Sequence, residues 1–165
     1  EQAGAIDGEG QNAVVLGSGG AARAGAYALL QLGFSVTMLA RSHEPVRKFA
    51  DTYGIALGSL SESVVVELAP KVVVQATPVG THGRDDGERL LPGYTPPPGT
   101  VVHDMVYQPV RTKLLEDCHA AGAVTVPGVE MFLRQARAQV RLFVGKDLSG
   151  DVLRSFLGGA AGSLR

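Results

Sequence analysis

The sequence has 165 residues, a formal net charge of −1 and 45% hydrophobic residues, which suffices for one domain with an apolar core and argues against a disordered chain. Acidic and basic residues are scattered, so the pattern indicates neither a nucleic-acid surface nor a membrane surface, and the apolar runs are too short to cross a bilayer. The single Cys118 suits a reducing compartment and is expected to be a packed thiol, while the four histidines lack metal-ligand spacing.

The chain begins at Glu1 with a polar, glycine-rich stretch. We interpret residues 1–11 as a linker or a truncated N-terminal segment, and residues 12–165 as one domain of a longer parent protein. In that domain β-branched runs alternate with helical patterns, which predicts an α/β fold: a doubly wound, mostly parallel six-stranded sheet with helices on both faces. Strands are expected at 13–16, 35–40, 55–57, 71–76, 100–104 and 123–126, and helices at 20–32, 44–53, 62–68, 110–121, 129–143 and 151–157.

A glycine-rich turn follows the first expected strand. Gly17, Gly19 and Ala22 fit the pattern G-x-G-x-x-G/A, in which small residues permit a tight turn, close backbone approach to a pyrophosphate and close helix packing. Such a turn can also be a plain connector, but the strand before it and the helix after it favour a Rossmann-like nucleotide site. The phosphate would lie at the start of the helix, on the backbone of Gly17, Ser18, Gly19, Gly20 and Ala21.

The end of the second expected strand indicates which cofactor fits. NAD-specific sites usually place an acid there to bind the ribose hydroxyls, whereas this sequence has Arg41 followed by Ser42. A guanidinium matches the geometry of a ribose 2′-phosphate, and the serine hydroxyl would add a donor. Arg41 also fits a solvated residue after a strand. The upstream glycine turn favours the phosphate role, and so predicts NADP.

Two further strand ends carry candidate contacts. Thr77 and Pro78 follow the fourth expected strand, where they fit either the cofactor's ribose wall or an ordinary turn. The proline-rich loop 80–99 is predicted to be an irregular excursion at one edge of the site. Met105, Tyr107 and Pro109 follow the fifth expected strand and form a candidate wall for the nicotinamide and substrate, although a packed tyrosine whose hydroxyl reaches water is the commoner role for Tyr107.

The helix expected after Gly128 has two different sides. At 3.6 residues per turn, one side of the helix carries Met131, Phe132, Gln135, Gln139 and Leu142, and another carries Glu130, Arg134, Arg137 and Arg141. A glutamine among apolar residues needs hydrogen-bond partners if it is buried, and a polyhydroxylated ligand would supply them.

Taken together, these motifs resemble the C-terminal, NADP-binding half of the shikimate dehydrogenase family, which includes quinate dehydrogenases and fused dehydroquinate dehydratase/shikimate dehydrogenases. The resemblance is carried in the family's order by 17–22 (GSGGAA), 40–42 (ARS), 75–80 (QATPVG), 104–109 (DMVYQP) and 128–136 (GVEMFLRQA). Ala40 departs from the asparagine of the family's Asn-Arg-Thr segment. The Glu-Met-Phe form of the last motif is similar to that of fused, plant-like proteins.

The resemblance implies specific roles. Arg41 and Ser42 would hold the 2′-phosphate, Thr77 with Pro78 would border the ribose, and Met105, Val106, Gly128 and Met131 would border the nicotinamide. Tyr107 and Gln135 would contact the substrate, shikimate, 3-dehydroshikimate or quinate. The family implies reversible NADP-dependent reduction of 3-dehydroshikimate to shikimate, in the pathway to aromatic amino acids, and a cytoplasmic location, or a plastid if the parent is plant-like.

The family's catalytic lysine and its partner aspartate belong to an N-terminal domain, and neither motif occurs in this sequence. We therefore predict no catalytic residue and no metal site in this chain, an N-terminal catalytic domain as its partner, and no turnover by this chain alone. The alternative is a non-catalytic, dehydrogenase-like sensor of quinate metabolism that retains the nucleotide site. Fold alone does not choose between the two.

Overall fold

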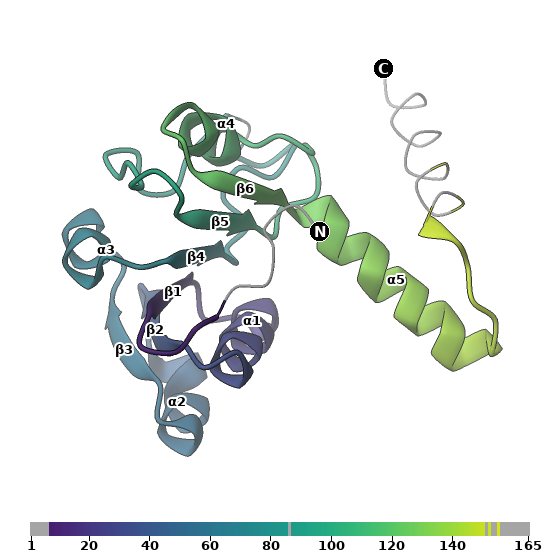
Figure 1. Ribbon diagram of the computed structural model, residues 1–165, viewed down its shortest axis with the longest axis horizontal. Helices are drawn as coiled ribbons and strands as arrows, with labels where there is room; N and C mark the ends of the chain where they lie inside the picture. Colours follow the sequence, from purple (N-terminus) through teal and green to yellow (C-terminus); the bar gives the residue numbers. More distant parts are fainter. Residues whose placement is uncertain (1–6, 86, 151, 153–154, 156–165) are drawn as a thin grey trace.

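The computed structural model describes residues 7–85, 87–150, 152 and 155. Strands and helices alternate along the chain as expected (Figure 1). The strands are β1 (Asn12–Leu16), β2 (Ser35–Ala40), β3 (Ala56–Ser59), β4 (Val72–Gln75), β5 (Val101–Asp104) and β6 (Val124–Pro127). The helices are α1 (Gly20–Gln31), α2 (Arg47–Tyr53), α3 (Glu62–Leu68), α4 (Lys113–Ala120) and α5 (Gly128–Val144), with a 3-10 turn η1 (Glu44–Val46) before α2.

The six strands form one sheet in the order β3-β2-β1-β4-β5-β6. All pairs within it are parallel, so the expected Rossmann-like sheet is confirmed, and it is wholly rather than mostly parallel in the part of the chain that is described. Because the strands point the same way, their carboxyl ends lie along one edge. The strand order reverses between β1 and β4, which is where open α/β sheets bind their ligands.

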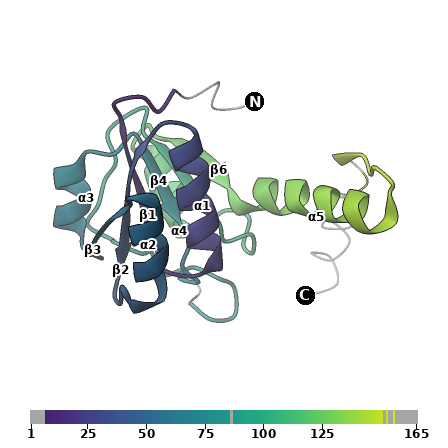
Figure 2. The same ribbon diagram turned by 90° about the horizontal axis from the view of Figure 1, so that it is seen from below.

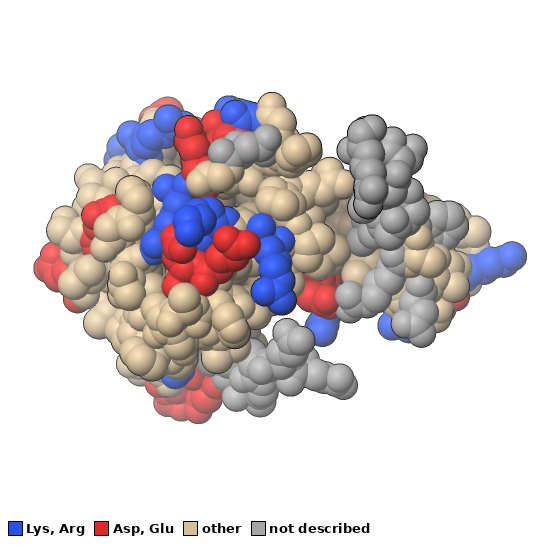
Figure 3. Space-filling view, turned by 90° about the horizontal axis from the view of Figure 1, so that it is seen from above, with Lys and Arg blue, Asp and Glu red and all other residues tan. Residues whose placement is uncertain are grey.

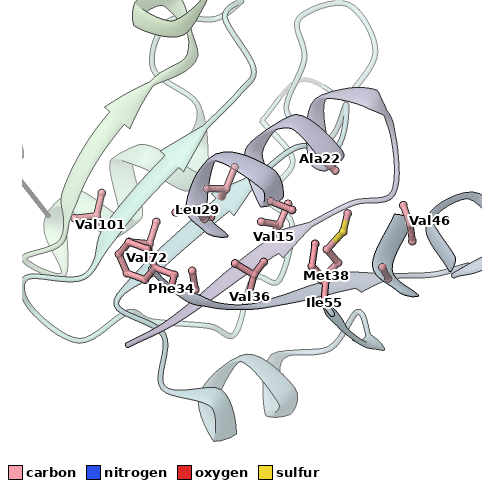
Figure 4. Packing of buried hydrophobic residues seen from close by; sticks show 14 residues of the cluster. Val15, Ala22, Leu29, Phe34, Val36, Met38, Val46, Ile55, Val72 and Val101 are labelled. Carbon is pink, nitrogen blue, oxygen red and sulfur yellow. The ribbon is translucent and has the colours of Figure 1, made fainter. Parts of the chain in front are cut away.

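Alternate residues of the central strands face two separate cores. The core under α1 and α2 includes Val15, Leu29, Val36, Met38 and Val72 (Figure 4). The core under α3 and α4 includes Val14, Leu39, Val65, Val73 and Leu115. Cys118 is fully buried in this second core, and burial raises the pKa of its thiol, which confirms the expectation of a packed residue.

Three element boundaries differ from expectation by more than one residue. The helix expected over 110–121 begins at Lys113, because Thr112 caps it by accepting a hydrogen bond from the backbone N–H of Leu115 at 3.3 Å. The helix expected over 44–53 opens with a 3-10 turn that contains Pro45, which has no N–H to donate. The third strand runs on to Ser59, where it still pairs with β2.

Helix α5 leaves the sheet and projects away from it (Figures 1 and 2). Only Gly128 and Leu133 of its 17 residues are buried. At its far end Leu142, Phe143 and Val144 are 81%, 77% and 63% exposed. The helix expected over 151–157 lies outside the described residues except for Val152 and Ser155.

Across the described ranges, no helix is both long and apolar enough to cross a membrane. The face of the molecule viewed from the α4 side carries intermixed acidic and basic side chains (Figure 3).

The irregular segment 80–99 stays near the strand ends only at its beginning. Further along, its residues Leu91 and Tyr94 enter the core under α3 and α4. The nearly buried Arg89 anchors it there: the guanidinium contacts the Asp117 carboxylate on α4 at 3.1 Å and donates to the backbone carbonyl of Tyr94. On the other side Glu62 of α3 accepts a hydrogen bond from the N–H of Gly93 at 2.6 Å. The segment therefore contributes to the core under α3 and α4.

Replacing Arg89 by methionine keeps an apolar stem but removes the guanidinium. We expect the free energy of unfolding to fall by about 2 kcal/mol, because the Tyr94 carbonyl and the Asp117 carboxylate lose a charged donor. The matched control is Arg84→Met, which breaks the exposed pair with Asp85 at 3.5 Å and should change stability by less than about 0.5 kcal/mol. Urea denaturation followed by circular dichroism measures both; equal losses in the two variants would contradict the anchoring role.

Candidate nucleotide-binding site

The turn between β1 and α1 is fixed by Gly17. Its φ of +125° is open only to glycine, and a Cβ there would lie 2.9 Å from the carbonyl oxygen of Ala76 and 3.4 Å from Cγ2 of Thr77. The N–H of Gly17 donates to the carbonyl of Leu39 at 2.9 Å. The turn is therefore clamped between the ends of β2 and β4, and Thr77 lies directly beside it.

The start of α1 has the properties of an anion site. Gly19 is its N-cap in extended conformation, with no side-chain cap, and no acidic residue lies in the first turn. A Cβ on Gly19 or Gly20 would meet no atom within 4 Å. The first N–H groups of a helix lack intrahelical acceptors and carry a partial positive charge, so this open end can bind a phosphate.

Arg41 and Ser42 directly follow β2, the strand next to β1, and both are exposed. The bond from the Gly17 N–H to Leu39 places the end of β2 alongside the glycine turn. Just beyond, Nε2 of His43 lies 2.9 Å from the carbonyl oxygen of Gly58, which ties this segment to β3. Arg41 therefore follows the strand end that lies beside the glycine turn.

Gln75, at the end of β4, organises the segment that contains Thr77 and Pro78. Its Nε2 donates to the carbonyl oxygens of Thr77 and Val79, each at 3.1 Å, and its Oε1 accepts from the Thr77 N–H. The Thr77 hydroxyl in turn accepts from the N–H of Val79 at 3.3 Å. The buried Gln75 side chain thus fixes the conformation of the turn, and Pro78 is exposed.

Asp104, at the end of β5, has the same role for the next segment. One carboxylate oxygen accepts from the Val106 N–H at 3.0 Å, and the other accepts from the Thr112 hydroxyl at 2.7 Å. Burial raises the pKa of this carboxyl, and the bonds from Thr112 and Val106 offset only part of that effect. The side chain of Asp104 is buried, so it shapes the strand end without being exposed at the surface.

The start of α5 packs against the same segment. A Cβ on Gly128 would lie 2.4 Å from the carbonyl oxygen of Val106 and 2.7 Å from that of Asp104, so only glycine allows this approach. Met105 reaches across to α1, where its Cε is 3.0 Å from the position of a Cβ on Gly25. Met131, on the first turns of α5, is half-buried.

Tyr107 stacks on Phe132 of α5, with ring centroids 4.9 Å apart and an interplanar angle of 17°. Residues at i and i+3 lie on one side of a helix, so this contact brings Tyr107 to the side of α5 that carries Gln135. Tyr107 is 45% exposed and Gln135 is exposed as well. Gln135 is therefore not enclosed by the apolar residues of its own helix, because α5 projects from the sheet.

The structure thus brings two sets of predicted site residues together. Thr77 lies beside the glycine turn, and Gly128 lies against Met105 and Val106. Sequence reasoning assigned no site role to Gln75, Thr112, Gly25 or Phe132. Two features of the sequence could have pointed to them: Gln75 and Asp104 are polar residues that end otherwise apolar strands, and Gly25 is a glycine inside a helical pattern. The described ranges contain no group of three or more His, Cys, Asp or Glu residues that could hold a metal ion.

No protein-family model matches the chain. It is 36% identical over 156 residues to the shikimate dehydrogenase (NADP(+)) of Methanothermobacter thermautotrophicus, a match that covers 90% of this chain and 55% of that protein. Identity to the protein of the same name from Chlorobium phaeovibrioides is also 36%, with the same coverage. The chain spans about half the length of these relatives.

Solved structures similar to this chain include a shikimate dehydrogenase and a quinate dehydrogenase. A shikimate 5-dehydrogenase from Thermus thermophilus, in complex with NADP(H) and shikimate, superposes with a TM-score of 0.73 at 29% identity, over 91% of this chain and 55% of that one. A quinate dehydrogenase from Corynebacterium glutamicum in complex with NAD gives a TM-score of 0.76 at 28% identity, over 91% and 56%. The ordered motifs, the parallel sheet and these matches agree that the chain belongs to the shikimate dehydrogenase family.

Proposed function

We propose that this chain is the NADP-binding part of a shikimate dehydrogenase, which reversibly reduces 3-dehydroshikimate to shikimate with NADPH. The observation that carries the proposal is the open, positively polarised start of α1 next to Arg41, at the point where the strand order reverses. In this proposal the start of α1 binds the pyrophosphate and Arg41 binds the 2′-phosphate. Both lie at the carboxyl edge of the sheet, as a dinucleotide with a 2′-phosphate requires. The relatives named NADP-dependent support the same cofactor.

The residues present fit this cofactor. The backbone of residues 17–21 would hold the pyrophosphate, because Gly19 and Gly20 leave space for it. Arg41 and Ser42 would bind the 2′-phosphate, and Thr77 with Pro78 would border the nicotinamide-side ribose. The nicotinamide would lie against the crowded junction of the β5 end and the α5 start, which is lined by Met105, Val106, Gly128 and Met131.

On the substrate side, Tyr107 and Gln135 would contact the polar groups of the ring. Both are exposed, and the stack on Phe132 holds the tyrosine ring against α5. The nicotinamide supplies the hydride when it is bound. The task of this chain is then to orient the cofactor and one side of the substrate, which lowers the entropic cost of the reaction.

Proton transfer and the rest of substrate binding we assign to a catalytic domain outside this chain. The relatives are nearly twice as long as the part that this chain matches. The exposed apolar end of α5, made of Leu142, Phe143 and Val144, is a suitable contact surface for such a domain. A reducing, cytoplasmic location is consistent with the buried free thiol of Cys118.

Arg41→Asp tests the cofactor assignment. The wild-type chain should bind NADPH more tightly than NADH; the variant should lose about tenfold or more in NADPH affinity, because a charge-assisted contact is worth about 1.5–3 kcal/mol, and should reverse the order. Titration calorimetry with both cofactors measures this. Arg134→Asp makes the same charge change on α5 and should leave the preference intact. Equal affinities of the wild-type chain for the two cofactors would sink the NADP assignment.

Two alanine variants separate the turn's shape from its ligand. Gly17→Ala should lower the free energy of unfolding by about 1–3 kcal/mol, because φ is positive and the Ala76 carbonyl is too close. Gly19→Ala meets no atom and should fold normally, yet weaken NADPH binding by about tenfold, since its methyl group occupies the phosphate approach. Thermal melts and NADPH fluorescence titrations measure the two effects. Wild-type affinity in Gly19→Ala would refute phosphate binding at this turn.

Gln135→Ala tests the substrate side in an enzyme that contains both halves. The change should lower kcat/KM for shikimate by an amount equivalent to about 1–3 kcal/mol, because a polar partner on the substrate is left unpaired. NADP affinity should remain near the wild-type value. Gln139→Ala, one turn further along α5, is the control and should behave as wild type. Unchanged shikimate kinetics in the Gln135 variant would leave that residue with a structural role only.

A further inference from the structure

Three polar side chains lie at the ends of β4 and β5 and at the cap of α4, and they are connected to one another. Gln75, Asp104 and Thr112 are each 1% exposed. Nε2 of Gln75 lies 3.4 Å from one oxygen of the Asp104 carboxylate, and the Thr112 hydroxyl donates to the other at 2.7 Å. The three residues come from β4, β5 and the cap of α4, so the network crosses from one strand end to the next.

Thr112 also accepts from the N–H of Leu115 in α4, whereas every further bond of Gln75 and Asp104 ends on the backbone just beyond the strand ends. Gln75 bonds the N–H and carbonyl of Thr77 and the carbonyl of Val79, and Asp104 bonds the N–H of Val106. A backbone bond between His82 and Gln108, at 2.9 Å, joins the same two segments further out. The network therefore fixes the two segments relative to each other as well as individually.

We propose that Gln75, Asp104 and Thr112 are positioning residues, which act on the cofactor by holding the Thr77 and Val106 segments at a fixed separation. The inference rests on the proposed function, in which the ribose and nicotinamide lie against these two segments. None of the three side chains reaches the cofactor itself, since each is buried under the backbone that it binds.

A buried carboxylate is a costly way to stabilise a fold. Burial raises the pKa of Asp104, so ionising this group in place costs free energy that apolar residues of similar volume would not cost. The acceptor capacity of the carboxylate explains its use: its two oxygens serve donors from β4, from the backbone after β5 and from Thr112, and a neutral apolar side chain serves none of them. A role in placing the Thr77 and Val106 segments therefore explains the buried carboxylate better than a role in stabilising the fold does.

The test compares Thr112→Val with Thr112→Ser. Valine keeps the shape but removes the hydroxyl that bonds Asp104, whereas serine keeps that hydroxyl. We expect Thr112→Val to weaken NADPH binding about tenfold, measured by fluorescence titration of the full chain, and Thr112→Ser to restore binding to within about twofold of wild type. Asp104→Asn keeps the volume and one acceptor and should weaken binding in the same direction, which keeps the test open should the valine variant fail to fold.

Thr112 also caps α4, so a cap control is needed. Ser61 caps α3 through the N–H of Val64 at 3.4 Å, and Ser61→Ala should lower the melting temperature without changing NADPH affinity. If Thr112→Val lowers the melting temperature but binds NADPH as wild type does, the network is merely structural and the inference is overturned. If the wild-type chain itself does not bind NADPH, the proposed function fails first and this inference fails with it.

Discussion

Backbone crowding at the carboxyl edge of the sheet is the constraint on which the site depends. At Gly17 the turn after β1 touches the end of β4, and at Gly128 the start of α5 touches the end of β5. Neither contact leaves room for a Cβ. These two contacts bring four chain segments to one short stretch of the sheet edge, where an extended dinucleotide can lie across them. The helices on both faces then keep the strands, and so the contacts, in register.

The crowded edge also explains the distribution of polar groups. Segments that turn this tightly leave backbone N–H and carbonyl groups without strand partners, and such groups need hydrogen bonds when they are buried. Gln75 and Asp104 supply those bonds from strand positions that would otherwise be apolar. The loop from 80 to 99 adds Leu91 and Tyr94 to the core under α3 and α4, and Arg89 ties it to α4. The polar residues at the strand ends are thus needed because the turns that follow them leave backbone groups without strand partners.

Local patterns predicted the strands well, because each strand is a short β-branched run with a clear end. They placed the start of α4 too early, because the Thr112 hydroxyl caps the helix at this point, and helix propensity alone does not account for that hydrogen bond. The partnership of Gln75 with Asp104 spans 29 residues of sequence and depends on strand order, which no local pattern contains. For Gln135, periodicity identified its neighbours on the helix surface; it could not indicate that α5 projects into the open.

That projection gives α5 the geometry of a lever. A helix of 17 residues is about 26 Å long, so tilting it by roughly 10° about Gly128 would carry its tip about 4 Å while Phe132, about 6 Å from the pivot, moved by only about 1 Å. For such a tilt, a group attached near Leu142 and Phe143 would therefore move by several ångströms relative to the sheet. The ring stack with Tyr107, close to the pivot, would stay in contact throughout that swing.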